Sequence, residues 1–165
     1  MSLIIKAPEE FLSLENVDND KLFLAGGITN VCNWQEDICS GLEDVVGLTI
    51  YNPRRDDFYI DDPLLEEEQI IWEFNHLRDC NMLLFWFSNE TVQPITLYEL
   101  GKWVNGNPNN KDKVWIGVDP NYPRANDVYI QTHLASPHIK IYNNLYDIQQ
   151  NIRSYFNEYE RDIRL

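Results

Sequence analysis

The chain has 165 residues, a length that fits one domain, and its 44% hydrophobic and 24% charged residues are typical of a globular protein. Acidic residues outnumber basic ones 27 to 13, and a net charge of −14 argues against binding to nucleic acid or to a membrane surface. The three cysteines lack CxxC spacing, and no apolar run approaches the roughly 18 residues of a membrane span. We expect a single domain over 1–165 in a reducing, cytoplasmic compartment.

Short apolar segments alternate with amphipathic ones along the chain. In order, the sequence predicts a strand over 21–25, a helix over 34–44 capped by Asn33, a strand over 45–51, a helix over 64–79 after Pro63, a strand over 82–87, a helix over 94–104, a strand over 113–118, a helix over 126–135, a strand over 138–142 and a helix over 145–160. This alternation indicates βαβ units.

The predicted fold is therefore a flavodoxin-like, doubly wound α/β fold with a five-stranded, mostly parallel sheet and helices on both faces. Ligands of such sheets bind outside the carboxyl ends of the strands, near the point where the strand order reverses. The residues that directly follow each strand are consequently the candidates for a binding site.

A glycine pair follows the first predicted strand. Gly26 and Gly27 allow the backbone to approach a ligand closely, and Thr29 and Asn30 add polar groups beside them. The spacing matches neither a dinucleotide fingerprint nor a P-loop. A plain tight turn is an equally good interpretation of the pair.

Two adjacent arginines follow the second predicted strand. Arg54 and Arg55 have the chemistry to clamp a phosphate or a carboxylate. The alternative is that they pair inside the protein with neighbouring acids, namely Asp56, Asp57, Asp61 or Asp62.

Polar Ser88 and Asn89 follow the third predicted strand, ahead of a helix that starts at Pro94. Glu99 lies on this helix next to Tyr98, beside the stripe that should face the sheet. A carboxylate partly removed from water is typical of catalytic sites, although a surface glutamate is the alternative interpretation. The three histidines show no HxxxH or similar pairing, so no metal site is predicted.

Several segments carry a family resemblance when they are taken in order: FLAGGITN, NWQ, YNPRR, WEFNHLRDCNMLLFWF and ETVQPITLYELGKW. Together they resemble the nucleoside 2-deoxyribosyltransferase-like family, in a divergent branch of it. The resemblance covers about residues 21–135, and its most specific part is a strand followed by a polar loop and an ELG helix.

The resemblance implies cleavage of the N-glycosidic bond of a deoxynucleoside and transfer of the sugar to another base or to water, with no cofactor. It makes Glu99 of the ELG motif the nucleophile, and Glu73 matches a family acid that is usually aspartate. A second family aspartate falls near Gln93, so that acid is missing or displaced here. Family members are commonly oligomeric, which predicts a homo-oligomer.

Aromatic residues near these positions either stack a nucleobase or pack in the core; they are Trp34, Trp72, Trp86, Tyr98 and Trp103. If the arginines meet phosphate, the substrate is a nucleotide and the reaction is hydrolysis, whereas internal pairing favours a nucleoside and transfer. Two other functions stay open. One is a module that binds a nucleotide or nucleotide-derived signal without turnover, and the other is an assembly protein.

Overall fold

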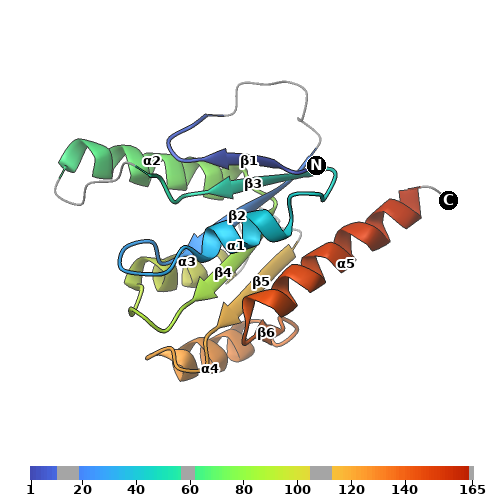
Figure 1. Ribbon diagram of the computed structural model, residues 1–165. Coiled ribbons are helices and arrows are strands. Elements are labelled where there is room, and N and C mark those ends of the chain that lie inside the picture. The colour runs from blue at the N-terminus through green and yellow to red at the C-terminus, as the bar shows by residue number, and fades with distance from the viewer. Residues whose placement is uncertain (11–18, 57–61, 105–112, 164–165) are drawn as a thin grey trace.

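The computed structural model describes residues 1–10, 19–56, 62–104 and 113–163 (Figure 1). Its strands are β1 Leu3–Lys6, β2 Asp20–Gly26, β3 Leu48–Asn52, β4 Met82–Phe87, β5 Lys113–Val118 and β6 Ile141–Tyr142. Its helices are α1 Trp34–Gly41, α2 Pro63–Asp79, α3 Pro94–Val104, α4 Ala125–Ala135 and α5 Leu145–Ile163. None of the helices in these ranges is both long and apolar enough to cross a membrane.

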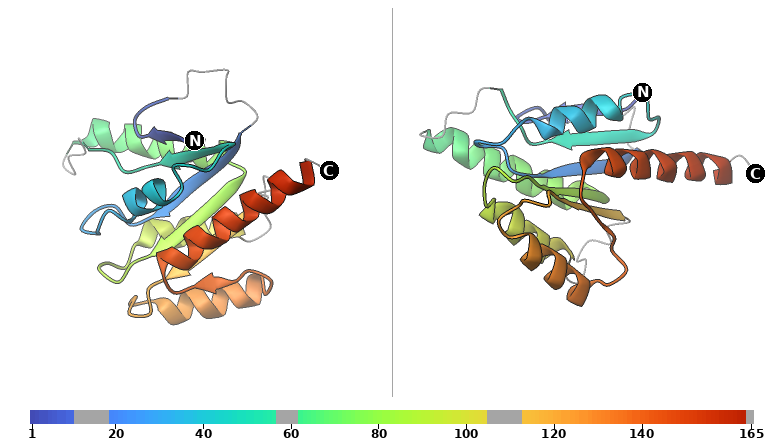
Figure 2. Two further views of the ribbon diagram at one scale, coloured as in Figure 1. Left: turned by 45° about the vertical axis from the view of Figure 1, so that its right-hand side comes forward. Right: turned by 60° about the horizontal axis from the view of Figure 1, so that its bottom comes forward.

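The strands form one sheet in the order β1-β3-β2-β4-β5-β6, and every neighbouring pair runs parallel. β2 lies between β3 and β4, where the direction of winding reverses. Helices α1 and α5 cover one face of the sheet, and α2, α3 and α4 cover the other (Figure 2). This arrangement confirms the predicted flavodoxin-like α/β fold.

The sheet has six strands rather than the expected five, because β1 pairs with β3 from Leu3↔Thr49 to Lys6↔Asn52. β1 has only four residues, and Ile4 on one side is 40% exposed whereas Ile5 on the other is buried. So short an edge strand carries too little apolar periodicity to stand out in the sequence.

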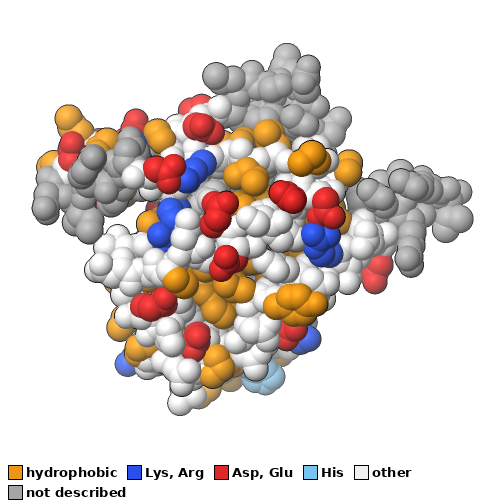
Figure 3. Space-filling model, in the orientation of Figure 1, with side chains coloured by type: hydrophobic (Ala, Val, Ile, Leu, Met, Phe, Trp, Pro, Cys, Tyr) orange, Lys and Arg blue, Asp and Glu red, His pale blue; other side chains and the backbone are white. Residues whose placement is uncertain are grey.

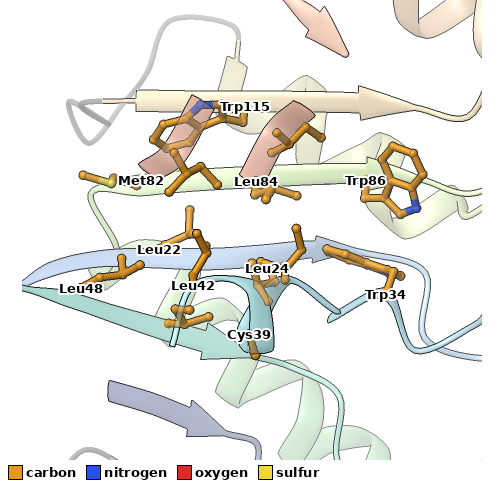
Figure 4. Packing of buried hydrophobic residues seen from close by; sticks show 14 of the residues in the cluster. Leu22, Leu24, Trp34, Cys39, Leu42, Leu48, Met82, Leu84, Trp86 and Trp115 are labelled. Carbon is orange, nitrogen blue, oxygen red and sulfur yellow. The ribbon is translucent and has the colours of Figure 1, made fainter. Parts of the chain in front are cut away.

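Two hydrophobic clusters pack on the two faces of the sheet, as the alternation of side chains along a strand requires. Leu22 and Leu24 of β2 point into the cluster below α1 and α5 (Figure 4). Phe23 and Ala25 point into the cluster below α2, α3 and α4. Gly26, the last residue of β2, thus stands at the carboxyl edge of a strand buried on both faces.

Helix and strand ends follow local signals. Asn33 caps α1 as predicted, since its side chain accepts a hydrogen bond from the N–H of Glu36 at 3.3 Å. The strand expected over 45–51 begins only at Leu48. Gly47 precedes it with a φ of 77°, a left-handed conformation that interrupts the extended chain.

The surface reflects the acidic composition. On the face that carries α1 and α5, acidic side chains are scattered over the described surface rather than gathered in one patch (Figure 3). One of the exposed ion pairs joins Arg153 of α5 to Asp44 at 2.6 Å. Exposed ion pairs of this kind contribute little to stability. The net negative charge of the surface keeps protein molecules apart through mutual repulsion.

Candidate active site

A cavity of about 560 Å³ opens at the carboxyl ends of β2 and β3, between α2 and α3. Its walls come from four segments: residues 25–29 at the end of β2, Pro53 and Arg55 after β3, the side of α2 that carries Gln69 and Glu73, and residues 91–96 with Glu99 around the start of α3. This is the position at which a doubly wound sheet binds its ligand. The volume lies in the range of small-molecule sites.

Two carboxyl groups face this cavity from different helices, Glu73 from α2 and Glu99 from α3. Burial, and then the negative charge of Glu73, raise the pKa of Glu99 to about 8, against a smaller opposing effect of Lys102. Burial also raises the pKa of Glu73, against a hydrogen bond that favours its charged form. The two carboxyls therefore titrate as a pair that retains a proton near neutral pH.

Gln69 lies one helical turn before Glu73 and also lines the cavity. Its Nε2 donates to Oε1 of Glu73 at 2.7 Å and to the carbonyl oxygen of Pro53 at 2.7 Å. The amide therefore ties Glu73 to the backbone that follows β3. The sequence does not single out Gln69, because one glutamine in an acidic helix gives no signal.

Gln93 links the two loops at the carboxyl ends of β2 and β4. Its Oε1 accepts the N–H of Gly27 at 3.0 Å, and its Nε2 donates to the carbonyl oxygen and Oγ of Ser88 at 3.0 and 2.8 Å. Its φ of 53° is left-handed, a conformation that costs a non-glycine residue roughly 1 kcal/mol or more. The hydrogen bonds compensate for that strain.

The glycine pair leaves no room for side chains. A Cβ on Gly26 would stand 2.5 Å from Cζ2 of Trp34, and one on Gly27 would stand 2.9 Å from Cδ of Gln93. Both contacts are far below van der Waals distance. These glycines are therefore required by close packing around the loop that lines the cavity.

Arg54 holds the same loop from behind. One of its terminal nitrogens, Nη2, donates to the carbonyl oxygens of Ile28, Val31 and Cys32 at 3.0, 3.0 and 3.1 Å. Its Nε donates to Gln35 at 3.0 Å. The guanidinium is thus used inside the protein, but by backbone carbonyls and Gln35 rather than by the neighbouring acids that the second interpretation named.

Arg55 lines the cavity, but its Nη1 donates to Oε2 of Glu68 at 2.6 Å and its side chain is only 4% exposed. The aspartates proposed as partners have other contacts where they are described: Asp56 pairs with Lys6, and Asp62 caps α2. The remaining two proposed partners, at 57 and 61, lie outside the described residues.

The structure brings several of the predicted site residues to the cavity wall: Gly26, Gly27, Thr29, Arg55, Glu73, Gln93 and Glu99. Other candidates lie outside that wall: Asn30, Trp34, Arg54, Ser88, Asn89 and Tyr98. Ser88 is buried against Gln93, Asn89 and Asn30 are exposed, and Tyr98 is 68% exposed on the outer side of α3.

Trp34 of α1 packs in the same core cluster as Trp86 of β4, near the end of β2 (Figure 4). Its side chain is fully buried, and its Nε1 donates to the carbonyl oxygen of Gly27 at 3.0 Å. Trp72 and Trp103 are buried in the other cluster. The packing interpretation thus holds for these four tryptophans, which support the cavity without lining it.

In the described ranges, no group of three or more His, Cys, Asp or Glu side chains is arranged to hold a metal ion. Acids predominate on the cavity wall, where Glu66, Glu73 and Glu99 outnumber the single described cation, Arg55. Among these acids, Glu73 and Glu99 interact electrostatically, and the amides of Gln69 and Gln93 lie beside them on the wall.

Comparison with known proteins identifies the family of this chain. The family model described as "Nucleoside 2-deoxyribosyltransferase like" matches residues 19–122, which confirms the resemblance in the sequence. Among solved structures, the chain resembles the CMP N-glycosidase BcmB of Clostridium botulinum with a TM-score of 0.51 and 17% identity. The match covers 82% of this chain and 99% of the other, and at this identity it shows a shared fold. No curated protein sequence matches the chain.

Proposed function

Because the chain belongs to the nucleoside 2-deoxyribosyltransferase-like family, we propose that it breaks the N-glycosidic bond of a nucleoside or nucleotide with Glu99 as the nucleophile. The observation that carries the proposal is the pairing of Glu99 with Glu73 in a cavity at the carboxyl edge of the sheet. Retaining glycosidases use two such carboxyl groups on either side of the bond that breaks.

Each carboxyl has one role in the proposed reaction. Ionised Glu99 attacks the anomeric carbon, the C–N bond breaks, and its electron pair leaves with the base. Glu73 supplies the proton that neutralises the leaving base and becomes a carboxylate. A water or a second base then takes the sugar from Glu99 and returns its proton to Glu73. The pair keeps a single proton near neutral pH, which burial and the negative charge of Glu73 hold on Glu99 in the free protein, so the reaction requires this proton to pass to Glu73 when the substrate binds.

The surroundings of the arginines favour an uncharged nucleoside as the substrate. Arg54 is used by the loop carbonyls and Arg55 by Glu68, so neither guanidinium is available to a phosphate without breaking these contacts. The acidic wall would further repel a phosphate. Transfer to a second base is then favoured over hydrolysis. Because the structurally similar BcmB is a CMP N-glycosidase, nucleotides are also included among the substrates to be tested.

A non-catalytic binding protein is the alternative, and one observation favours it. Gln93 stands near the position of the second family acid, and its amide is fully engaged with Gly27 and Ser88. It has no proton to give or take at neutral pH. Binding without turnover would leave the ligand intact.

The test is incubation of the purified protein with deoxynucleosides, ribonucleosides and their 5′-monophosphates, followed by chromatography for free base. Glu99→Gln keeps the shape of the side chain but removes the nucleophile, so it is the matched control. Base released by the wild type and not by Glu99→Gln supports the proposal. Retention of intact ligand with a thermal shift, and no base released, supports the binding protein.

We also propose a homo-oligomer, supported by apolar side chains of α2 and α3 that are left in solvent. Ile71 and Phe74 of α2 and Tyr98 of α3 lie outside the cavity wall and are 52, 49 and 68% exposed, and Ile70 and Ile95 on that wall are 57 and 65% exposed. Apolar side chains gathered in this way are typical of contact surfaces between proteins. Size-exclusion chromatography with light scattering measures the mass of the protein in solution, and the mass of a monomer would contradict the proposed homo-oligomer.

A further inference from the structure

The side-chain amide of Gln69 is only half satisfied: its NH2 group donates two hydrogen bonds, whereas its carbonyl oxygen accepts none from the described residues. Gln69 is 7% exposed, and Nε2 donates to Pro53 and Glu73 as described above. Its Oε1 is buried and has no hydrogen-bond partner among the described residues. A buried acceptor without a donor is unfavourable, so something must hold the amide in this orientation.

The carbonyl group of Pro53 fixes that orientation. A peptide carbonyl accepts hydrogen bonds and cannot donate them, so the group that faces it must be the NH2 of Gln69. Rotating the amide by 180° would place Oε1 against the oxygens of both Pro53 and Glu73. The unsatisfied Oε1 is the consequence of keeping the amino group on these two acceptors.

We propose that Gln69 is a positioning residue that holds Oε1 of Glu73 as a hydrogen-bond acceptor, so that a proton taken up by this carboxyl goes to Oε2. The use of that proton in base departure rests on the proposed function, whereas its placement on Oε2 does not. A proton fixed on one oxygen has one direction of delivery, which general acid catalysis requires.

Acidic groups outnumber cations around Glu73. Glu99 faces it from α3 and Glu66 shares its helix and its cavity wall, while the cation Arg55 is paired with Glu68. Gln69 is the neutral donor to Glu73, and it is the contact that lowers the pKa of this carboxyl against its burial. Removing the donor should make the doubly ionised pair harder to form.

The first experiment compares Gln69→Met with the wild type by ¹³C NMR titration of the glutamate carboxyls. The last proton of the pair should leave at a pH about one unit higher in Gln69→Met, because the fully ionised pair loses its donor. Thr132→Val is the matched control, a buried polar side chain on α4 replaced by an isostere, and it should leave the titration unchanged. Identical titrations in wild type and Gln69→Met would overturn the proposal.

A second measurement needs no substitution. In the wild type, the side-chain NH2 resonances of Gln69 should shift with the same midpoint as the carboxyl of Glu73, and resonances that stay constant would overturn the proposal. Neither titration requires turnover. If no base is released, the proposed enzymatic activity is refuted, but the placement of the proton on Oε2 of Glu73 is not. If the protein releases base and both titrations are flat, only the placement of the proton is refuted.

Discussion

Oε1 of Gln93 accepts a hydrogen bond from the N–H of Gly27 at 3.0 Å, although 66 residues separate them in the chain. Through the same amide, Nε2 of Gln93 donates to Ser88 at the end of β4. One side chain thus joins the loop after β2 to the loop after β4, at the point where the sheet reverses its winding. The shape of the cavity wall depends on this amide.

Replacing Gln93 with leucine should therefore affect both stability and activity. The N–H of Gly27 loses its acceptor and Ser88 loses its donor, while the left-handed backbone conformation remains. We expect the free energy of unfolding to fall by about 2–3 kcal/mol and base release to slow by at least tenfold. Denaturant titration and the base-release assay measure these two quantities. A variant as stable and active as the wild type would contradict the role given to Gln93.

Gly27 and Gly101 provide a matched pair of substitutions. Gly27→Ala places a Cβ 2.9 Å from both Gln93 and Val31, so the loop must move, and we expect a loss of about 1–3 kcal/mol of unfolding free energy. Gly101→Ala meets nothing within 4 Å in the interior of α3, and we expect a gain of about 0.5–1 kcal/mol. Thermal unfolding of both variants tests the pair, and effects of the same sign would refute the steric argument.

The order of elements follows from the sequence because each buried strand is a run of apolar residues, while α1, α3 and α5 have an amphipathic stripe and α2 begins at the signal of Pro63. β4 and α3 begin and end where their patterns predicted. β1 was not predicted from the sequence, because an edge strand of four residues shows too short a pattern of apolar residues. The length of β6 also differed, since only Ile141 and Tyr142 pair with β5.

The site was only partly predictable, for a physical reason. The rule that ligands bind after the strands located the glycine pair, and the ELG resemblance located Glu99, since both signals are local. Whether Trp34 faces a ligand or the core depends on the direction in which α1 leaves β2, which no local pattern encodes. Gln69 was missed for the same reason, because its importance comes from Pro53 and Glu73 after folding.

Arg54 should resist even conservative replacement. Lysine retains the charge but is a point donor on a flexible chain, and it cannot reach three carbonyl oxygens and Gln35 at once. We expect Arg54→Lys to slow base release at least tenfold, because the loop of Ile28 loses its support. Arg153→Lys is the control, since Arg153 binds the carbonyl of Gly41 on α1. Equal activity losses in the two variants would show that the effect does not come from the loop that Arg54 holds.

Glu99 should make the stability of the protein depend on pH, and the sign follows from its pKa. The carboxyl has a pKa of about 8 in the folded chain against an ordinary value of 4.5, so the folded state binds its proton more tightly than the unfolded state. The contribution of Glu99 to the free energy of unfolding is fully present below pH 4.5 and is lost as the pH rises to about 8.

Glu99→Gln removes this pH dependence while keeping the shape of the side chain. The variant should match the wild type near pH 4 and exceed it by a margin that grows up to pH 8 and then stays constant. Denaturant unfolding of both proteins from pH 4 to pH 9 measures the margin. A margin that does not change with pH would mean that Glu99 ionises as an ordinary surface carboxylate, and the proposed sharing of a proton with Glu73 would then be wrong.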